Sequence, residues 1–138
     1  MSLPFHYVEF RTFCYATEAE SRVKAALQTF LPTDADVERT VNEGHFGDPI
    51  VVLSTRLERA DEIRHVFSLL RENLDFETLS AELPERIDDN NSLFLQFDKG
   101  AAFRGAVALG DGITFRAKVE AYPATRDGAI ENARTALS

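Results

Sequence analysis

The chain has 138 residues, of which 44% are hydrophobic and 10% aromatic, enough for one domain with its own core. Asp and Glu number 23 against 15 Lys and Arg, and the resulting net charge of −8 argues against a simple nucleic-acid binder with a basic surface. No apolar run approaches the roughly 20 residues that span a bilayer, and no signal-peptide pattern is present, so we expect a cytoplasmic protein. Eleven Phe and no Trp predict that phenylalanine supplies most of the large side-chain volume packed in the core.

The first half of the chain alternates between strand and helix patterns. Residues 5–16 predict a strand whose side chains alternate, with Val8, Phe10 and Cys14 on one face and Tyr7, Glu9, Arg11, Phe13 and Tyr15 on the other. Thr17 and Glu20 fit a capping box and predict the start of a helix that ends at Pro32. A weakly apolar strand over 37–42 and a central strand over 50–58 are predicted next, with a loop between them.

The second half predicts more helix and a run of strands. Apolar residues at helical spacing indicate a helix up to Leu74, and Asp75 is expected to cap a short helix that Pro84 stops. Leu93, Leu95 and Phe97 mark a strand, and residues 103–109 and 113–121 predict a hairpin turned at residues 110–112. The last strand should point Ile113, Phe115, Ala117 and Val119 inward, and a helix over about 127–137 follows.

This order of elements predicts an α+β fold in a single domain, residues 1–138. We expect one mainly antiparallel sheet of about five to six strands with the helices packed on one of its faces. The other face is then free to meet solvent or a partner.

Motifs for catalysis and metal binding are missing from the sequence. It has no nucleophile elbow, phosphate-binding loop or dinucleotide fingerprint, and no paired Cys or His with zinc spacing. Glu43, His45 and Asp48 could gather around a metal, but a His that packs or hydrogen-bonds within a structured loop is the simpler interpretation. We therefore predict a protein that is not an enzyme and has no cofactor and no metal site.

The loop between the predicted strands at 37–42 and 50–58 is the first candidate for RNA contact. Gly44 and Gly47 allow backbone conformations that other residues avoid, and His45 and Phe46 offer rings on which unstacked bases can stack. The alternative is a loop in which Phe46 only closes the edge of the core.

Basic side chains supply two further candidates. Lys99, at a strand end with Arg104 nearby, could contact a phosphate, or it could form a turn with Asp98 that ends the strand. Arg116 and Lys118 lie on the polar face of the last strand and, with Arg11, could bind single-stranded RNA on an open sheet. The alternative for these three is a solvated sheet face.

Four segments can be considered together: the strand His6–Phe13, the helix start Ala16–Glu18, the loop Glu43–Ile50 and the segment Leu95–Ala102. In this order and with compatible spacing, they resemble one archaeal family of proteins described as predicted RNA-binding proteins or exosome subunits. One departure is Gln96, where the resemblance leads us to expect Arg. With only three lysines, the acidic composition is also similar to that of proteins from salt-loving archaea, although ordinary acidic cytosolic proteins share it.

The resemblance implies a fold like that of the ribosomal protein that binds 5S rRNA, and a role in RNA binding. It places the contacts at the loop Gly44, His45, Phe46 and Gly47 and at Lys99, with Arg11 and Arg104 as helpers. The expected partners are RNA and, beyond it, exosome or ribosome-associated proteins. The alternative is a protein-interaction module that dimerises through the sheet face or a strand edge, so monomer and dimer both stay open.

Overall fold

The computed structural model describes residues 3–43 and 47–138 of the chain. Within these residues it consists of one sheet and a set of helices, which confirms the predicted α+β class. In chain order the elements are β1 Phe5–Cys14, α1 Glu20–Gln28, β2 Glu38–Glu43, β3 Pro49–Leu57, α2 Ala60–Asn73, α3 Phe76–Arg86, β4 Ser92–Asp98, α4 Lys99–Phe103, β5 Gly112–Val119 and α5 Arg126–Leu137.

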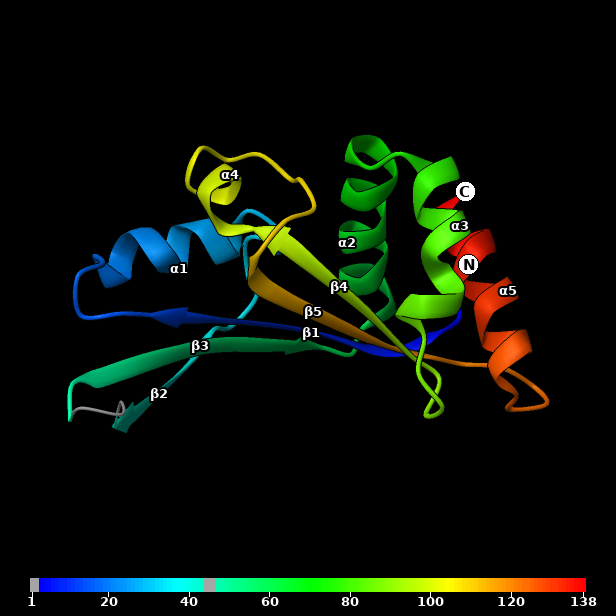
Figure 1. The fold of residues 1–138 in the computed structure, drawn as a ribbon, viewed down its shortest axis with the longest axis horizontal. Coiled ribbons are helices and arrows are strands. Elements are labelled where there is room, and N and C mark those ends of the chain that lie inside the picture. Colours follow the sequence, from blue (N-terminus) through cyan, green and yellow to red (C-terminus); the bar gives the residue numbers. More distant parts are fainter. Residues whose placement is uncertain (1–2, 44–46) are drawn as a thin grey trace.

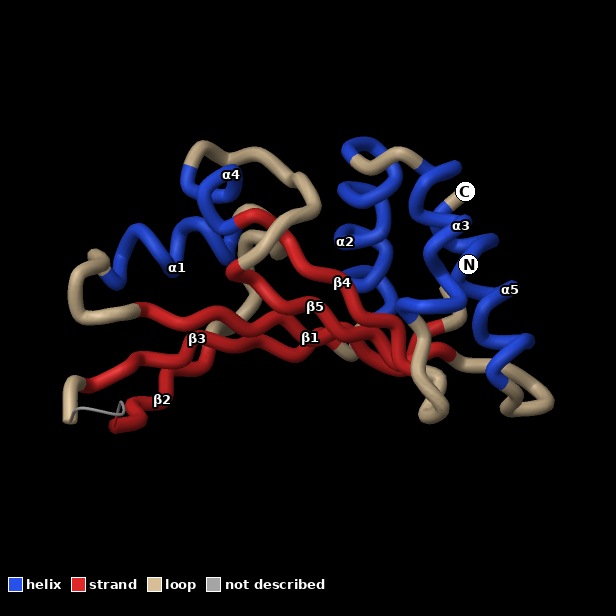
Figure 2. The backbone as a smooth tube through the Cα atoms, in the orientation of Figure 1, coloured by secondary structure: helices blue, strands red, loops and turns tan. Residues whose placement is uncertain are grey.

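The strands form one antiparallel sheet in the order β2-β3-β1-β5-β4 (Figure 2). The first strand of the chain therefore lies in the middle of the sheet. Val8 of β1 is opposite Leu57 of β3 on one side and Ala117 of β5 on the other. Every neighbouring pair is antiparallel, as predicted.

The helices lie on one side of the sheet in two groups, which Figure 1 shows clearly. The first group, α1 with α4, lies at one end, and α2, α3 and α5 lie at the other. None of the helices in the described part of the chain lies on the opposite side, which we call the open face. The predicted layout of helices on one face is confirmed.

Phenylalanine rings build the core between the sheet and the helices. The fully buried Phe side chains are Phe10, Phe30, Phe67, Phe97 and Phe115. The ring centroid of Phe10, on the central strand, is 5.1 Å from that of Phe30 and 5.3 Å from that of Phe115. Such tilted and edge-to-face pairs add to the free energy that burial provides. The expected role of Phe in the core is confirmed, and Ile113, Phe115, Ala117 and Val119 all point inward as predicted.

The predicted capping box at the start of α1 is wrong. The residue before the helix is Ala19, and no side chain caps the free amides of its first turn. The carboxylate of Glu18 instead accepts a hydrogen bond from the backbone N–H of Tyr15, at 3.0 Å. Glu18 therefore stabilises the turn between β1 and α1 rather than the first turn of the helix.

The predicted strand over 103–109 is also wrong. The Asp98 side chain accepts hydrogen bonds from the backbone amides of Gly100 and Ala101 and so starts the short helix α4 directly after β4. Ala101 and Ala102 are buried, and α4 packs against α1. Of the predicted strand, Leu109 alone pairs as an isolated bridge, with Phe97. The cap at Asp98 thus favours a helix immediately after β4, although the apolar pattern of residues 103–109 had predicted a strand.

Helix α3 begins as predicted but ends later. Asp75 caps it by accepting a hydrogen bond from the backbone N–H of Thr78, at 3.2 Å. The helix runs past Pro84 to Arg86, because a proline this close to the end removes a single intrahelical bond. The carbonyl of Ser80, which that bond would have used, accepts a hydrogen bond from Arg134 of α5 at 3.4 Å.

Among the described helices, none combines the length and apolar content needed to cross a membrane.

Candidate nucleic-acid interface

Side chains of alternating residues from all the described strands meet on the open face. Their positions follow from the pairing register: Glu9 of β1 is opposite both Arg56 of β3 and Arg116 of β5, and Arg116 is opposite Phe94 of β4. The centre of this face is hollowed into a depression of about 430 Å³. Its lining residues are Glu9, Phe10, Arg11, Glu38, Ser54, Thr55, Arg56, Phe94, Thr114 and Arg116.

Two arginines flank one tyrosine beside this depression. The guanidinium carbon of Arg56 lies 3.8 Å from the ring centroid of Tyr7, and that of Arg116 lies 5.6 Å from it. Arg116 also donates a hydrogen bond of 2.5 Å to the Tyr7 hydroxyl. This hydrogen bond raises the pKa of Arg116, so its charge is firmly kept. We call Tyr7, Arg56 and Arg116 the arginine–tyrosine cluster.

Glu9 is the carboxylate partner of this cluster. Its Oε1 lies 3.2 Å from Nη1 of Arg56, and both side chains keep contact with solvent, 33% and 51% exposed. An exposed ion pair of this kind contributes about 0–1 kcal/mol to stability and does not prevent a guanidinium from binding another anion. The cluster is therefore held in place while its charge remains available.

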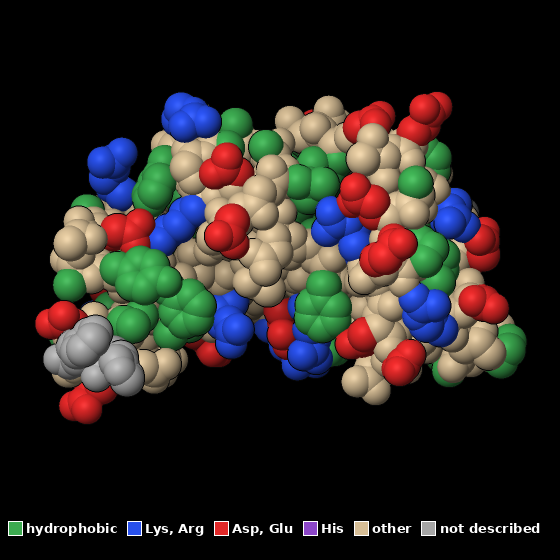
Figure 3. Space-filling view, viewed as in Figure 1, with side chains coloured by type: hydrophobic (Ala, Val, Ile, Leu, Met, Phe, Trp, Pro, Cys, Tyr) green, Lys and Arg blue, Asp and Glu red, His purple; other side chains and the backbone are tan. Residues whose placement is uncertain are grey.

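Exposed aromatic rings continue the open face on both sides. Phe94 is 38% exposed and Phe13 is 37% exposed, although both are large apolar side chains. Arg11 lies over the Phe13 ring at 5.6 Å, and Phe13 stacks with Tyr15 at 6.4 Å between centroids. Figure 3 shows hydrophobic and basic side chains along the lower border of the molecule, below the helices. Flat rings next to guanidinium groups suit unstacked bases joined by phosphates.

Lys118, also predicted from the sequence, lies on the open face at the end of β5. It is paired across the sheet with Tyr7 and with Ser92. Its ammonium donates to the backbone carbonyl of Asn90, and the residue as a whole is half-buried. The structure thus brings Arg11, Arg116 and Lys118 together on one face.

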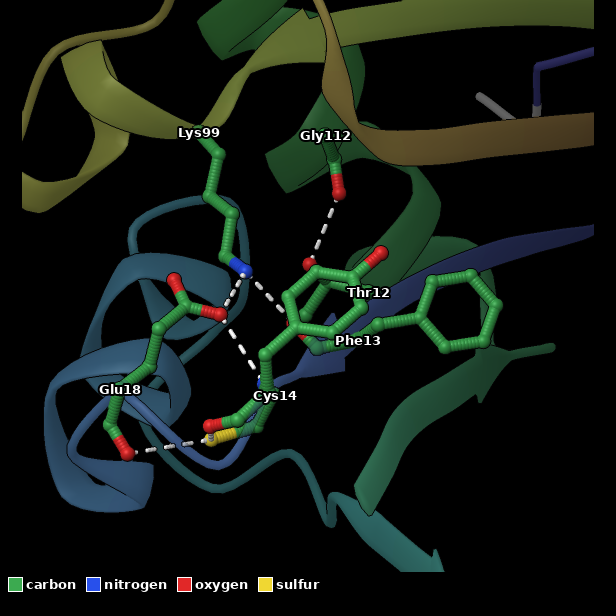
Figure 4. Close-up of polar contacts among 7 residues, drawn as sticks. Thr12, Phe13, Cys14, Glu18, Lys99 and Gly112 are labelled. Atoms are coloured by element: carbon green, nitrogen blue, oxygen red, sulfur yellow. Dashed lines mark hydrogen bonds and ion pairs between the residues drawn. The ribbon is translucent and has the colours of Figure 1, made fainter. Parts of the chain in front are cut away.

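Lys99 is placed differently from the other predicted residues. Its ammonium donates to the Phe13 carbonyl at 2.5 Å and to Glu18 Oε1 at 2.9 Å, and its side chain is only 13% exposed (Figure 4). It lies 5.4 Å from the Tyr15 ring centroid. Lys99 therefore joins α4 to the turn between β1 and α1, and two of the three N–H donors of its ammonium are used within the protein.

The carboxyl of Glu18 responds to this environment. Burial alone would raise its pKa, but the hydrogen bonds from Lys99 and from the Tyr15 amide, with the charge of Lys99, lower the pKa overall. Cys14 lies beside it, with Sγ 3.7 Å from the Glu18 carbonyl oxygen, and burial raises the pKa of its thiol. Cys14 is buried on the face that it shares with Val8 and Phe10, as the alternation of the first strand predicted.

The glycine loop lies mostly outside the described residues. This applies to Gly44, His45 and Phe46. Gly47 is described: it is exposed and has φ of +81°, a conformation that favours glycine.

Arg104 is exposed at the C-terminal end of α4, away from the open face. Over residues 3–43 and 47–138, His, Cys, Asp and Glu side chains form no group of three that could hold a metal ion.

Two residues of the open face were not predicted as RNA contacts. Arg56 follows the alternation in which Leu53, Thr55 and Leu57 point to the core, so its outward position was readable from the sequence. Phe94 lies between the inward Leu93 and Leu95 in the same way. Both alternations were visible in the sequence. The one around Arg56 was not used because the apolar, β-branched residues of its strand indicated a central, mainly apolar strand.

Comparison with known proteins now places the chain in a family. A family model described as RNA binding matches residues 7–119. The chain belongs to this RNA-binding family. A relative from Pyrococcus abyssi that bears the name RNA-binding protein is 32% identical, and the match covers 96% of this chain and 93% of the relative. The resemblance to an archaeal RNA-binding family is thereby confirmed.

Two solved structures of archaeal proteins share the fold. One, from Methanothermobacter thermautotrophicus, is 39% identical with a TM-score of 0.84 and covers 97% of this chain and 98% of its own. The other, from Archaeoglobus fulgidus, is 30% identical with a TM-score of 0.86 and covers 96% of this chain and 99% of its own. These two proteins share the arrangement described above over nearly their whole length.

Proposed function

We propose that the protein binds RNA through the open face of its sheet. The observation that carries the proposal is the grouping of Arg11, Arg56, Arg116 and Lys118 on one surface of a chain whose net charge is −8. Membership of the RNA-binding family supports the choice of ligand. Binding rather than catalysis fits the family, and an accessory role in RNA processing, at the exosome or on the ribosome, is the biological setting we propose.

The glycine loop is a second proposed contact with the same RNA. Gly44, His45, Phe46 and Gly47 lie between β2 and β3, two of the strands that form the open face. His45→Ala and Phe46→Ala are expected to weaken binding by removing rings on which bases stack. Equal affinity in both variants and in the unchanged protein would remove the loop from the site.

A pair of double variants tests the main proposal. Arg11→Glu with Arg56→Glu reverses two charges on the open face, and Lys24→Glu with Arg104→Glu makes the same change in charge at exposed positions on α1 and after α4. Affinity for a fluorescent RNA is measured by anisotropy over a series of KCl concentrations, with circular dichroism as the check on folding.

We expect the open-face variant to lose about tenfold or more in affinity and the control variant to lose little. The slope of log K against log salt should shrink by about 0.7 for each phosphate contact that is lost with single-stranded RNA. Equal losses in the two variants would show that general charge, rather than this face, governs binding. No affinity of the unchanged protein for structured or single-stranded RNA, at low or at molar KCl, would end the proposal.

Salt tolerance is part of the proposal. The acidic, lysine-poor composition suits high salt, where exposed charges repel one another only within about 3 Å at 1 M. Phosphate contacts weaken steeply under those conditions, so the exposed rings of the open face would carry more of the affinity.

Self-association through the sheet is the second candidate function. All the residues of β2 are exposed, and its outer edge is unpaired within the described part of the chain. Unpaired strand edges are templates for pairing with another chain. Light scattering across concentrations separates the two functions, because a strict monomer that binds RNA leaves no role for this edge.

A further inference from the structure

We propose that the hollow of the open face selects unpaired RNA and stacks one base on Phe94. This inference rests on the proposed function and adds the class of RNA and a base-binding position. Phe94 is on β4, one of the edge strands of the sheet, and it lines the depression from that side.

The size of the hollow separates single strands from duplexes. Its volume of about 430 Å³ is within the range of pockets that hold small ligands, about 300–1,000 Å³. A few nucleotides of a single strand can enter such a space. Double-stranded RNA is bound instead through its shape over many base pairs, with contacts to its minor groove and phosphates. A double helix would contact the rim of the hollow and leave its floor empty.

The hollow also has a direction across the sheet. Its lining runs from Glu38 on β2 to Phe94 on β4, the two outer strands. Neighbouring strands are about 4.8 Å apart, so these ends are separated by roughly 19 Å. Arg11, Arg56 and Arg116 lie between them on the inner strands. A single strand crossing the sheet would meet a ring at one end and cations in the middle.

Phe94 and Arg116 are placed so that one nucleotide could bind both of them, with its base on the ring and its phosphate at the guanidinium. They are directly opposite in the β4–β5 pairing, and Arg116 is fixed by its hydrogen bond to Tyr7. Side chains directly opposite in an antiparallel pair have Cβ atoms about 4.5–5.5 Å apart. A base on the Phe94 ring would therefore present its phosphate to a guanidinium already held in position, at little cost in conformational entropy.

The acidic residues of the hollow act against duplexes as well. Glu9 and Glu38 line the same depression as the arginines. Carboxylates repel a phosphate backbone but accept hydrogen bonds from the N–H groups of base edges. The Watson–Crick edges are free in an unpaired strand and paired in a duplex. The mixed charge of the hollow thus favours bases that face its floor.

The absence of tryptophan from the sequence permits a direct test. Phe94→Trp places a single tryptophan in the hollow, and Tyr122→Trp places one outside it, at a residue that is 83% exposed and precedes α5. Each variant is titrated with an unpaired oligonucleotide and with a blunt duplex of the same length, and tryptophan fluorescence is recorded. Anisotropy of labelled RNA reports binding independently of the tryptophan.

We expect the unpaired RNA to quench the tryptophan at position 94 and to leave the one at position 122 unchanged. The duplex should bind more weakly and quench neither. Phe94→Ala should weaken binding of unpaired RNA by about fivefold to 100-fold, as loss of one stacked base does, without changing the salt slope. Phe94→Tyr, which keeps a ring, should restore the affinity.

Two results would overturn the inference while leaving the proposed function intact. One is RNA binding by anisotropy with no quenching at position 94, and the other is equal binding and quenching by the duplex. No binding of any RNA by the unchanged protein would instead remove the proposed function itself. The two failures are therefore distinguishable.

Discussion

The chain contains two similar groups of a cation, a carboxylate and a tyrosine ring, and they differ mainly in burial. Lys99 lies 2.9 Å from Glu18 and 5.4 Å from the ring of Tyr15, and these two charged side chains are 13% and 24% exposed. In the second group, Arg56 lies 3.2 Å from Glu9 and 3.8 Å from the ring of Tyr7, with its side chain 51% exposed.

Because of this difference in burial, we expect the Lys99 group to contribute to stability and the Arg56 group to contribute to ligand binding. Lys99 donates two hydrogen bonds within the protein. Removing it takes the cationic partner from the partly buried Glu18 carboxylate, which keeps its bond from the Tyr15 amide, and takes a donor from the Phe13 carbonyl. Arg56 keeps half of its surface in contact with solvent, so its removal leaves no buried group unpaired. The same chemistry therefore holds the fold together in one place and offers a charge to a ligand in the other.

The largest expected effect comes from forcing the Lys99 group apart without removing a charge. Gly112 has φ of +112°, and a Cβ there would lie 2.6 Å from Cβ of Lys99. Gly112→Ala should therefore lower the free energy of unfolding by about 3 kcal/mol, through backbone strain and steric overlap. Chemical denaturation measures this. Gly105→Ala is the control, because Gly105 has φ of +76° but no atoms within 4 Å of its Cβ position; an equal loss there would leave backbone conformation as the whole cause.

Removing the buried cation should have the next largest effect. Lys99→Ala is expected to lower the free energy of unfolding by about 1.5–3 kcal/mol, the range for a hydrogen bond to a charged group. RNA affinity of the folded fraction should stay unchanged, because the proposed site does not include this ammonium. Denaturant titration and anisotropy on the same sample decide the matter. If Lys99→Ala were as stable as the unchanged protein but bound RNA more weakly, Lys99 would be a phosphate contact after all.

The ionisation of Glu18 gives a smaller effect that depends on pH. Its pKa in the folded protein is below the ordinary value of 4.5, so its contribution to stability is present above that value and is lost as the pH falls through the lowered pKa. The difference in unfolding free energy between the unchanged protein and Glu18→Gln should be constant near neutral pH and shrink in acid. A difference that grows in acid would contradict this assignment.

The smallest change in stability is expected at the exposed group. Arg56→Ala should alter the free energy of unfolding by about 0.5 kcal/mol or less, because its ion pairs with Glu9 and Glu58 are exposed. The same variant should bind RNA more weakly and with a smaller salt slope. A loss of stability as large as that of Lys99→Ala would mean that the two groups do not differ in role.

Local pattern was enough to predict most of the sheet. The alternation of Val8, Phe10 and Cys14 with Tyr7, Glu9 and Arg11 correctly separated the core face from the open face. The alternation of residues 113–121 likewise placed Arg116 on the outward face of its own strand, and the pairing of β1 with β5 brings Arg11 and Arg116 onto one surface. The order of the strands within the sheet, in contrast, depends on contacts between distant segments that periodicity does not report.

Competition between local signals explains the remaining differences. Thr17 and Glu20 had the spacing of a capping box, but Glu18 was bound by Lys99, 81 residues away in sequence, and the turn took another form. Lys99 was predicted as a phosphate contact because its position at a strand end was visible and its partners were not. A cation's availability depends on the partners that the fold brings to it, and no sequence window shows these.

The pairing of the first strand with the last has a consequence for how the molecule is made. The Thr12 hydroxyl donates to the carbonyl of Gly112, 100 residues further along, and β1 has β5 as a direct neighbour. A ribosome must therefore release most of the polypeptide before β1 acquires its second neighbour. Such distant pairings slow folding to about milliseconds to seconds in small domains, and until they form an unpaired edge is open to other nascent chains.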